Sequence, residues 1–409
     1  MKKKNSKKGI EPGITRRTIL MTTAIFLVAS ALFLLSETNH VALAQKVETV
    51  NVGMLFPLSG PGAGWGIAES RVVELKLKEI NDAGGWKVGN KIYKFKGFKE
   101  DDKYMGSVAA QATARLVHDL DCKVIIGSNG SSPVLAMHPI TTDNKVPVFC
   151  NSYTELAVTA ERKYFFRVCN TSREFAPVIW KYTKERWPSI KQIAAIGMND
   201  ATGQAETKHI KDGCDPLGIK VDIELFEPEQ KEFYPMLTRI LAKNPDAMDP
   251  TCCALGSASL IMKQARELGF KGRFISSVFL EPALNGPIAG FENIEGSLTI
   301  QWDWAKGSPA ERAFYKKWCD NWNPKEWTSA TATFVVGLEI WLEAIQKVGS
   351  VDADKIKELI ESGYQFNTSL FGKIKFVGKE SYGVNHQLRV PIVISEVKDK
   401  NLVEVWREK

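Results

Sequence analysis

A glycine-rich loop near the start of the chain is the first stretch whose residue types and spacing could do chemistry. The segment VGMLFPLSGPGAGWG spans residues 52–66, and glycines at 60, 62, 64 and 66 follow its apolar start. A strand, a glycine-rich turn and a helix form the setting in which backbone N–H groups hold a phosphate. The spacing excludes both nucleotide-binding patterns. No Lys-Ser or Lys-Thr pair follows the glycines, and each G-x-G-x-x-G register has Trp65, Ile67 or Glu69 in place of its last glycine. Two interpretations remain: the glycines serve turn geometry while Trp65 caps a core, or Trp65 covers a bound ligand.

Polar loops follow four of the predicted strands. They are PLSGPGAGWG (57–66), GSNGSSPV (127–134), CNSYTE (150–155) and NDATGQ (199–204). In open α/β sheets, ligands bind at the carboxyl ends of the strands. Neutral hydroxyls and free N–H groups at helix N-termini suit a carboxylate. The loops therefore predict a site for a small anionic or amide group, with no cofactor and no metal.

The motifs expected of an enzyme are missing. The stretch GSNGSSP does not match the G-x-S-x-G pattern of a serine hydrolase, and His138 lies on a predicted helix seven residues beyond Ser131. The five histidines form no H-E-x-x-H motif. Asp101 and Asp102 follow a strand, where we interpret them as loop caps. We expect a binding protein rather than an enzyme, with a secreted hydrolase as the less favoured alternative.

The cysteines indicate neither a zinc ribbon nor a thioredoxin-like site, because they show no C-x-x-C spacing. Seven are present, so in an oxidising compartment at least one thiol is left unpaired or bonds to another chain. They stand at positions Cys122, Cys150, Cys169, Cys214, Cys252, Cys253 and Cys319.

The elements that must position these loops alternate between strand and helix. An apolar strand runs to Phe56, and a helix is predicted over 68–82 because its apolar residues recur at helical spacing. The alternation restarts after Asn170, which predicts an α/β fold of two doubly wound parallel-sheet lobes with a ligand cleft between them. Further strand-like pieces near the C-terminus indicate that the chain crosses between the lobes more than once.

The first 44 residues read as a secretory signal peptide. A basic segment containing Arg16 and Arg17 precedes an apolar stretch, and the A-x-A motif at 42–44 predicts cleavage before Gln45. The paired arginines favour twin-arginine export, with the general secretory route as the alternative. No cysteine stands near the cleavage site, which excludes a lipoprotein anchor. We expect a periplasmic protein.

The net charge of +7 belongs mainly to this leader. The first 44 residues hold seven of the 54 Lys and Arg and two of the 47 Asp and Glu, which leaves 47 bases against 45 acids. The near-neutral remainder gives no reason to expect a nucleic-acid partner.

A set of motifs in a fixed order resembles the branched-chain amino acid (Leu/Ile/Val) type of periplasmic binding protein, the solute receptors of ABC importers. The motifs are LSGPGAGWG, EINDAGG, KEDDKY, VIIGSNGSSP, TELA, QARELGFKGRF and AIQKVGS, between about Val47 and Val397. The resemblance implies a monomer with two lobes joined by a three-crossover hinge, which closes over a small molecule and delivers it to an ABC permease. Lobe 1 is expected over 46–169 and 300–385, and lobe 2 over 170–299 and 386–409.

The resemblance also implies the site residues of lobe 1. The serine that binds the ligand's carboxylate falls on Ser131, with Ser132 beside it. A backbone carbonyl and a hydroxyl of the next loop fall on Cys150 and Ser152. The aromatic residue of the first loop falls on Trp65, which favours a ligand-covering role for that side chain.

Lobe 2 departs from the family pattern. The usual tyrosine is Thr202, and the usual carboxylate for a ligand's ammonium is Val278, with Glu281 three residues further on. An unpaired ammonium in a closed cleft costs several kcal/mol. The ligand class therefore stays open between an amino acid, an amide and an organic or aromatic acid without an amine. A ligand-sensing domain of a regulator or receptor is the alternative function on the same fold.

Overall fold

The structure is a computed structural model that describes residues 46–408 apart from 253, 278–279 and 329–330. Residues Val47–Lys409 form one compact unit. Its strands gather into one eight-stranded and one seven-stranded sheet, and a separate two-stranded hairpin. The signal peptide predicted for residues 1–44 lies outside the described residues, as does Val278.

The first sheet has the strand order β14-β15-β6-β5-β4-β1-β3-β2. Its central strands β1, β4, β5 and β6 are parallel, while β2–β3 and β14–β15 pair antiparallel at the two edges. The strands are β1 (Lys46–Phe56), β2 (Trp86–Val88), β3 (Lys91–Asp101), β4 (Val124–Asn129), β5 (Val148–Asn151), β6 (Phe165–Arg167), β14 (Phe376–Val377) and β15 (Gln387–Leu388).

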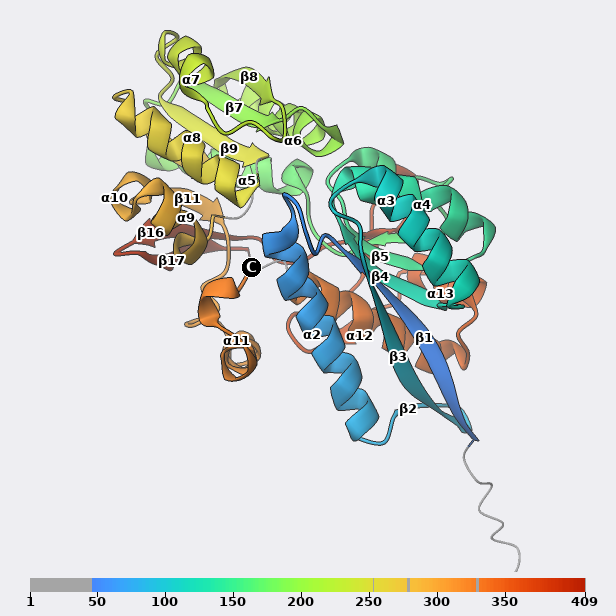
Figure 1. Cartoon of the computed structure of the whole chain (residues 1–409). Helices are drawn as coiled ribbons and strands as arrows, with labels where there is room; N and C mark the ends of the chain where they lie inside the picture. The colour runs from blue at the N-terminus through green and yellow to red at the C-terminus, as the bar shows by residue number, and fades with distance from the viewer. Residues whose placement is uncertain (1–45, 253, 278–279, 329–330, 409) are drawn as a thin grey trace, which may run out of the picture. The chain divides into compact units, whose positions relative to one another are not determined.

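Helices cover both faces of this sheet. In Figure 1, α2 and α12 lie along one face and α3 and α4 along the other, and the two buried clusters divide the alternate residues of the strands in the same way. The bounds are α2 (Ala63–Asp82), α3 (Gly106–Ala114), α4 (Ser131–Asp143), α12 (Thr331–Val348) and α13 (Ala353–Glu361), with a short π-helical turn over Arg115–Asp119.

The second sheet has the order β17-β16-β11-β10-β9-β7-β8, parallel from β8 to β11 and antiparallel at β16 and β17. Its strands are β7 (Gln192–Met198), β8 (Lys220–Phe226), β9 (Ala247–Cys252), β10 (Arg273–Ser276), β11 (Leu298–Ile300), β16 (Val393–Lys398) and β17 (Asn401–Arg407). Its helices are α5 (Ser172–Arg186), α6 (Ala201–Cys214), α7 (Tyr234–Leu241), α8 (Leu255–Glu267), α9 (Pro282–Ala289) and α10 (Phe291–Ile294). The predicted α/β fold of two lobes is confirmed, with antiparallel strands added at the sheet edges.

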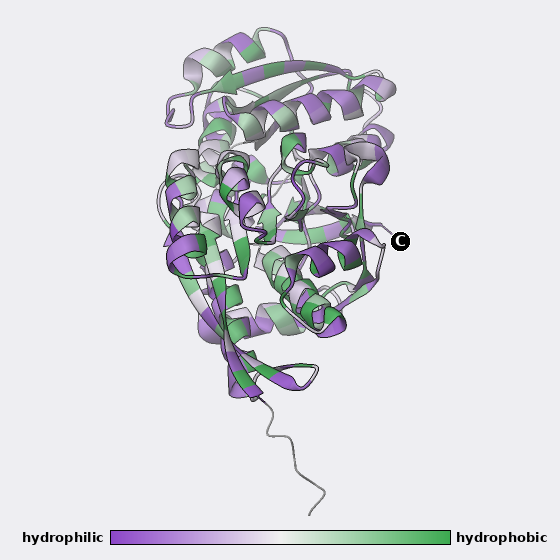
Figure 2. Ribbon diagram, turned by 90° about the vertical axis from the view of Figure 1, so that its right-hand side faces the viewer, coloured by the Kyte–Doolittle hydropathy of each residue, from purple (hydrophilic) through white to green (hydrophobic). Residues whose placement is uncertain are grey.

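The remaining elements are short, apart from α11, which follows β11 in the chain. They are α11 (Pro309–Asn321), α14 (Lys379–Tyr382), the hairpin β12 (Phe366–Thr368) and β13 (Gly372–Ile374), and 3-10 turns at Glu155–Ala157, Asp215–Leu217 and Pro324–Glu326. In Figure 2 the inner strands are mainly green, while the outer strand ends and the helices carry both colours. That pattern is expected of strands buried on both faces. Among the helices of the described residues, none is long and apolar enough to span a bilayer.

The chain passes between the two sheets three times. The first passage follows β6, the second follows β11, and the third lies between β15 and β16. The first and third are hydrogen-bonded to each other: the Asn170 amide donates to the Val390 carbonyl (2.7 Å) and accepts from the Val390 N–H (3.2 Å). The backbone N–H of Gln301, in the second passage, donates to the carbonyl of Val393 at 3.1 Å. The three passages therefore form one hinge. The predicted lobe limits remain a proposal, except that β15 (Gln387–Leu388) pairs with β6 of the first sheet, which moves the last limit from residue 386 to the passage at 389–392.

Four tryptophan side chains after β11 and around α11 form a buried aromatic cluster. Trp302 and Trp304 follow β11, with ring centroids 5.6 Å apart, and Trp304 stands 5.4 Å from Trp327. Trp318 of α11 contacts Trp327 at 5.5 Å. These rings join α11 to the core of the first sheet.

Candidate functional site

The glycine-rich loop after β1 is held by a carboxylate. Asp101 accepts hydrogen bonds from the Leu58 N–H (2.8 Å) and from the Ser59 hydroxyl (2.6 Å), while its neighbour Asp102 accepts from the Tyr104 N–H (2.7 Å). The interpretation of both aspartates as loop caps is therefore confirmed. The helix after this loop begins at Ala63 rather than at residue 68, so Trp65 lies in the first turn of α2 and is half-buried.

Ser131 connects three of the predicted loops. It is the first residue of α4, it is fully buried, and its hydroxyl accepts hydrogen bonds from the backbone N–H groups of Tyr153 (3.2 Å) and Thr154 (3.1 Å). The Ser152 hydroxyl lies 3.4 Å from the same oxygen. The backbone N–H of Ser131 donates to the Thr202 hydroxyl at 3.3 Å. Residues of lobe 1 and lobe 2 thus meet at the N-termini of α4 and α6.

Other predicted residues of lobe 1 lie around this point. Ser132 is the second residue of α4 and is half-buried. Cys150 is fully buried in β5, and its carbonyl accepts the Val168 N–H at 3.0 Å, so that carbonyl serves the sheet. Burial raises the pKa of the Cys150 thiol to about 12. The Arg167 guanidinium donates to the Ser152 carbonyl at 3.1 Å, which fixes the 152–154 loop from behind.

Thr202 lies in the first turn of α6 and has an aromatic neighbour that sequence reasoning missed. The Asp200 carboxylate caps α6 by accepting the N–H groups of Thr202 (2.9 Å) and Gly203 (2.8 Å). The Tyr104 side chain, which comes from lobe 1, hydrogen-bonds the Thr202 side chain, and burial raises the pKa of the Tyr104 hydroxyl. A tyrosine side chain of lobe 1 therefore contacts the residue of lobe 2 that stands where the family pattern has its own tyrosine.

Two buried carboxyl groups were also missed. Glu69 of α2 is fully buried and accepts the Asn129 amide at 2.7 Å. Glu206 of α6 is fully buried and accepts the backbone N–H of Ser172 at 3.3 Å. Burial raises the pKa of Tyr153 well above its usual value, and both glutamates add to that increase, so all three side chains share one region. A periodic helix pattern gives no signal for such residues.

A second contact between the lobes lies at the edge of the site. Glu155, in the 3-10 turn after β5, forms an ion pair with Arg173 of α5, and its carboxylate lies 3.3 Å from Nε2 of His209 of α6. Burial lowers the pKa of His209, and the nearby Glu155 carboxylate opposes that effect. This contact links the two lobes through charge.

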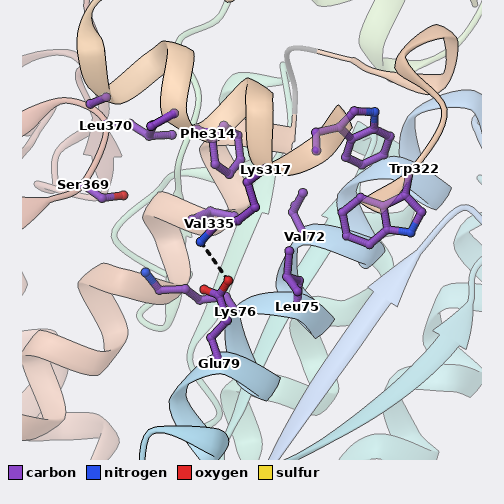
Figure 3. A pocket seen from close by; sticks show the side chains of 13 residues that line it. Val72, Leu75, Lys76, Glu79, Phe314, Lys317, Trp322, Val335, Ser369 and Leu370 are labelled. Atoms are coloured by element: carbon purple, nitrogen blue, oxygen red, sulfur yellow. Dashed lines mark ion pairs between the residues drawn. The ribbon is translucent and has the colours of Figure 1, made fainter. Parts of the chain in front are cut away.

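A pocket of lobe 1 lies elsewhere, further along α2. Its volume is about 240 Å³, and it is bounded by α2, α11 and the loop at Leu370 (Figure 3). Apolar side chains line most of it, and the Lys317 ammonium lies 2.8 Å from the Glu79 carboxylate at its edge. None of the predicted site residues lines this pocket.

Neither a metal site nor a disulfide is found in the described part of the chain. No group of three or more His, Cys, Asp or Glu there could hold an ion. The described cysteines with free thiols are Cys122, Cys150, Cys169, Cys214 and Cys319.

Two α/β lobes, a three-passage hinge and polar helix N-termini that meet between the lobes define a type I solute-binding architecture. The sequence profile of the periplasmic binding protein family matches residues 49–401, and the chain belongs to that family. It is 25% identical over 330 residues to a Leu/Ile/Val-binding protein homolog of Brucella suis, an alignment that covers 78% of this chain and 84% of the relative.

Solved structures share the fold. A leucine binding protein from Thermotoga maritima has a TM-score of 0.74 at 23% identity, covering 88% of this chain and 98% of its own. A solute binding protein of an ABC transporter from R. palustris, in complex with 4-hydroxybenzoate, has a TM-score of 0.74 at 18% identity, covering 88% and 97%. Both resemble this chain in architecture.

Proposed function

We propose that the mature chain is the periplasmic solute receptor of an ABC importer. It binds a small solute with a carboxylate or amide group between the lobes, closes about the three-passage hinge and delivers the solute to the permease. The family and the naming of the relatives support this role. Capture and release of a solute need no nucleophile or acid–base pair. The proposed role is therefore that of a binding protein and not of an enzyme.

The observation that carries the proposal is the hydrogen bond from the Ser131 N–H to the Thr202 hydroxyl. It brings together the positive ends of α4 and α6, one from each lobe. Ser131 and Ser152 place hydroxyls at the same point. A ligand group that hydrogen-bonds the side chains of both Ser131 and Thr202 gains contacts from both lobes, which favours the closed form. Trp65 and Val278 are proposed to face the remainder of the ligand.

The test is a thermal-shift screen of the mature chain against amino acids, aromatic acids, dicarboxylates and amides, followed by calorimetry. A ligand at 100 times its Kd adds about 2.7 kcal/mol of stability. The variant Ser131→Ala should weaken binding by about tenfold to a hundredfold, the equivalent of about 1.5–3 kcal/mol for a hydrogen bond to a charged group.

The matched control is Ser362→Ala, which removes an exposed hydroxyl that bonds only the carbonyl of Leu359. Its affinity and melting temperature should equal those of the wild type. Unchanged affinity in Ser131→Ala would place the site on other loops.

A further inference from the structure

A buried carboxyl group with one unused oxygen stands beside the proposed anion site. Glu69 lies four residues after Trp65 on α2, so the two side chains share one face of the helix. Its Oε1 accepts the Asn129 amide at 2.7 Å. Its Oε2 is buried and has no hydrogen-bond partner within the described part of the chain. A buried acceptor without a partner costs about 1–3 kcal/mol, so this atom is the one in the region that most needs a donor.

The position of Asn129 places this oxygen near Ser131. Asn129 is the last residue of β4, and Ser131 follows two residues later. Two residues span at most about 7 Å of extended chain, which is the scale of a small amino acid. Glu69 of α2, which accepts the Asn129 amide, therefore lies close to the N-terminus of α4, where Ser131 begins the helix.

The charges around Glu69 favour a positive group. Burial raises the pKa of Glu69 well above its usual value, Asn129 opposes that increase, and the Asp102 carboxylate adds to it. Among the described residues, no basic side chain acts on it in the opposite direction. Across the site, Tyr153 is influenced by Glu69 and by Glu206 of the other lobe. A second anionic end of a ligand would meet two acids here, whereas a cationic nitrogen would find a charge partner.

We propose that Glu69 binds a cationic nitrogen of the ligand through its unpartnered oxygen, while Ser131 holds the ligand's carboxylate. The inference rests on the proposed receptor function and narrows it to solutes that carry an amine. It assigns to α2 of lobe 1 the counter-charge that the sequence pattern led us to seek near Val278. Burial raises the pKa of Glu69, and a cationic amine beside it lowers that pKa again, so binding of an amine favours release of a proton to solution.

The experiment compares matched ligand pairs by calorimetry on the mature chain. The pairs are leucine with 4-methylpentanoate, phenylalanine with 3-phenylpropanoate and 4-aminobutanoate with butanoate. The wild type should bind the amine-bearing member of at least one pair at least tenfold more tightly. Titrations in buffers of different ionisation enthalpy should show proton release with the amine alone, a readout that needs no variant.

Two variants of α2 separate this role from a structural one. Glu69→Gln keeps the volume and the bond to Asn129 and should lower the preference for the amine at least tenfold, without weakening the nitrogen-free acid. Glu74→Gln removes only the exposed ion pair with Lys99. It should change neither the preference for the amine nor the affinity for the nitrogen-free acid. An equal affinity for both members, or a preference that survives in Glu69→Gln, overturns the inference and leaves the receptor function standing. If no member of any pair binds, the inference about Glu69 is overturned, and the wider ligand screen alone decides the receptor function.

Discussion

Asp101 and Asp102 are adjacent in sequence, but their pKa values are shifted in opposite directions. Partial burial alone would raise the pKa of Asp101, but hydrogen bonds from Ser59, Lys103 and Leu58 outweigh it and lower that pKa. Burial raises the pKa of Asp102 to about 6, against the hydrogen bonds that it accepts from Ser128 and Tyr104. The folded state therefore favours the anionic form of Asp101 and the neutral acid form of Asp102.

We predict that Asp102 makes the protein less stable as pH rises from about 4 through about 6. The unfolded aspartate titrates near pH 3.9, so above that value the folded state must hold a proton that the unfolded chain has released. Asp102→Asn should remove this loss, which is read as a smaller fall in melting temperature between pH 4 and pH 7. Asp101→Asn is the control. The lowered pKa of Asp101 stabilises the fold at neutral pH, and this stabilisation is lost as pH falls, so the variant should change the pH profile in the opposite direction. Identical pH profiles for wild type and Asp102→Asn would contradict the assignment.

The helices α2 and α6 of the site each contain a glycine where the helix passes very close to the end of the preceding strand. A Cβ on Gly66 of α2 would lie 2.2 Å from the Pro57 carbonyl oxygen. A Cβ on Gly203 of α6 would lie 2.0 Å from the Met198 carbonyl oxygen. The same close approach therefore seats α2 of lobe 1 and α6 of lobe 2 against the ends of the strands that precede them.

We predict that Gly66→Ala lowers the free energy of unfolding by about 1–3 kcal/mol, because the backbone at Pro57 must move. Solute affinity should also fall, since α2 carries Trp65 and Glu69. Gly64→Ala is the matched control: its Cβ would meet only Leu255, at 3.9 Å, and alanine favours the helix by up to about 1 kcal/mol. Denaturant unfolding of both variants measures the difference, and equal losses would contradict the close-approach argument.

The elements were largely predictable from the sequence, because strand and helix periods alternate clearly in it. The start of α2 was not, since Gly64 and Gly66 lower the helix propensity of a first turn that packing nevertheless makes helical. Ser131 was predicted from its family motif and lies where the lobes meet. Glu69 was not predicted as a site residue, because a glutamate between Ala68 and Ser70 looks the same in sequence whether it faces solvent or a buried strand end.

The whole chain is predicted to leave the cytoplasm through its N-terminal leader. The basic leader with Arg16 and Arg17 predicts passage through the twin-arginine route. Changing both residues to Lys should block export, which is measured as the share of protein in a periplasmic extract. Undiminished export would assign the leader to the general secretory route.

The second prediction for the whole chain concerns its mature N-terminus. The A-x-A motif at 42–44 predicts cleavage before Gln45 and a free, unlipidated product. Intact-mass measurement of exported protein should give the mass of residues 45–409. A lipid adduct or a retained leader would contradict a freely diffusing receptor.

The aromatic cluster at the second passage gives the molecule an optical reporter. Trp302 and Trp304 are buried directly after β11, where the chain leaves the second sheet, and Trp304 packs edge-on against Trp327. Any rotation about the hinge must change the surroundings of these indoles, so solute binding should shift the intrinsic fluorescence of the unlabelled protein. Trp304→Phe should remove most of that shift while the solute still binds. Hinge closure can then be followed in real time without attaching a dye.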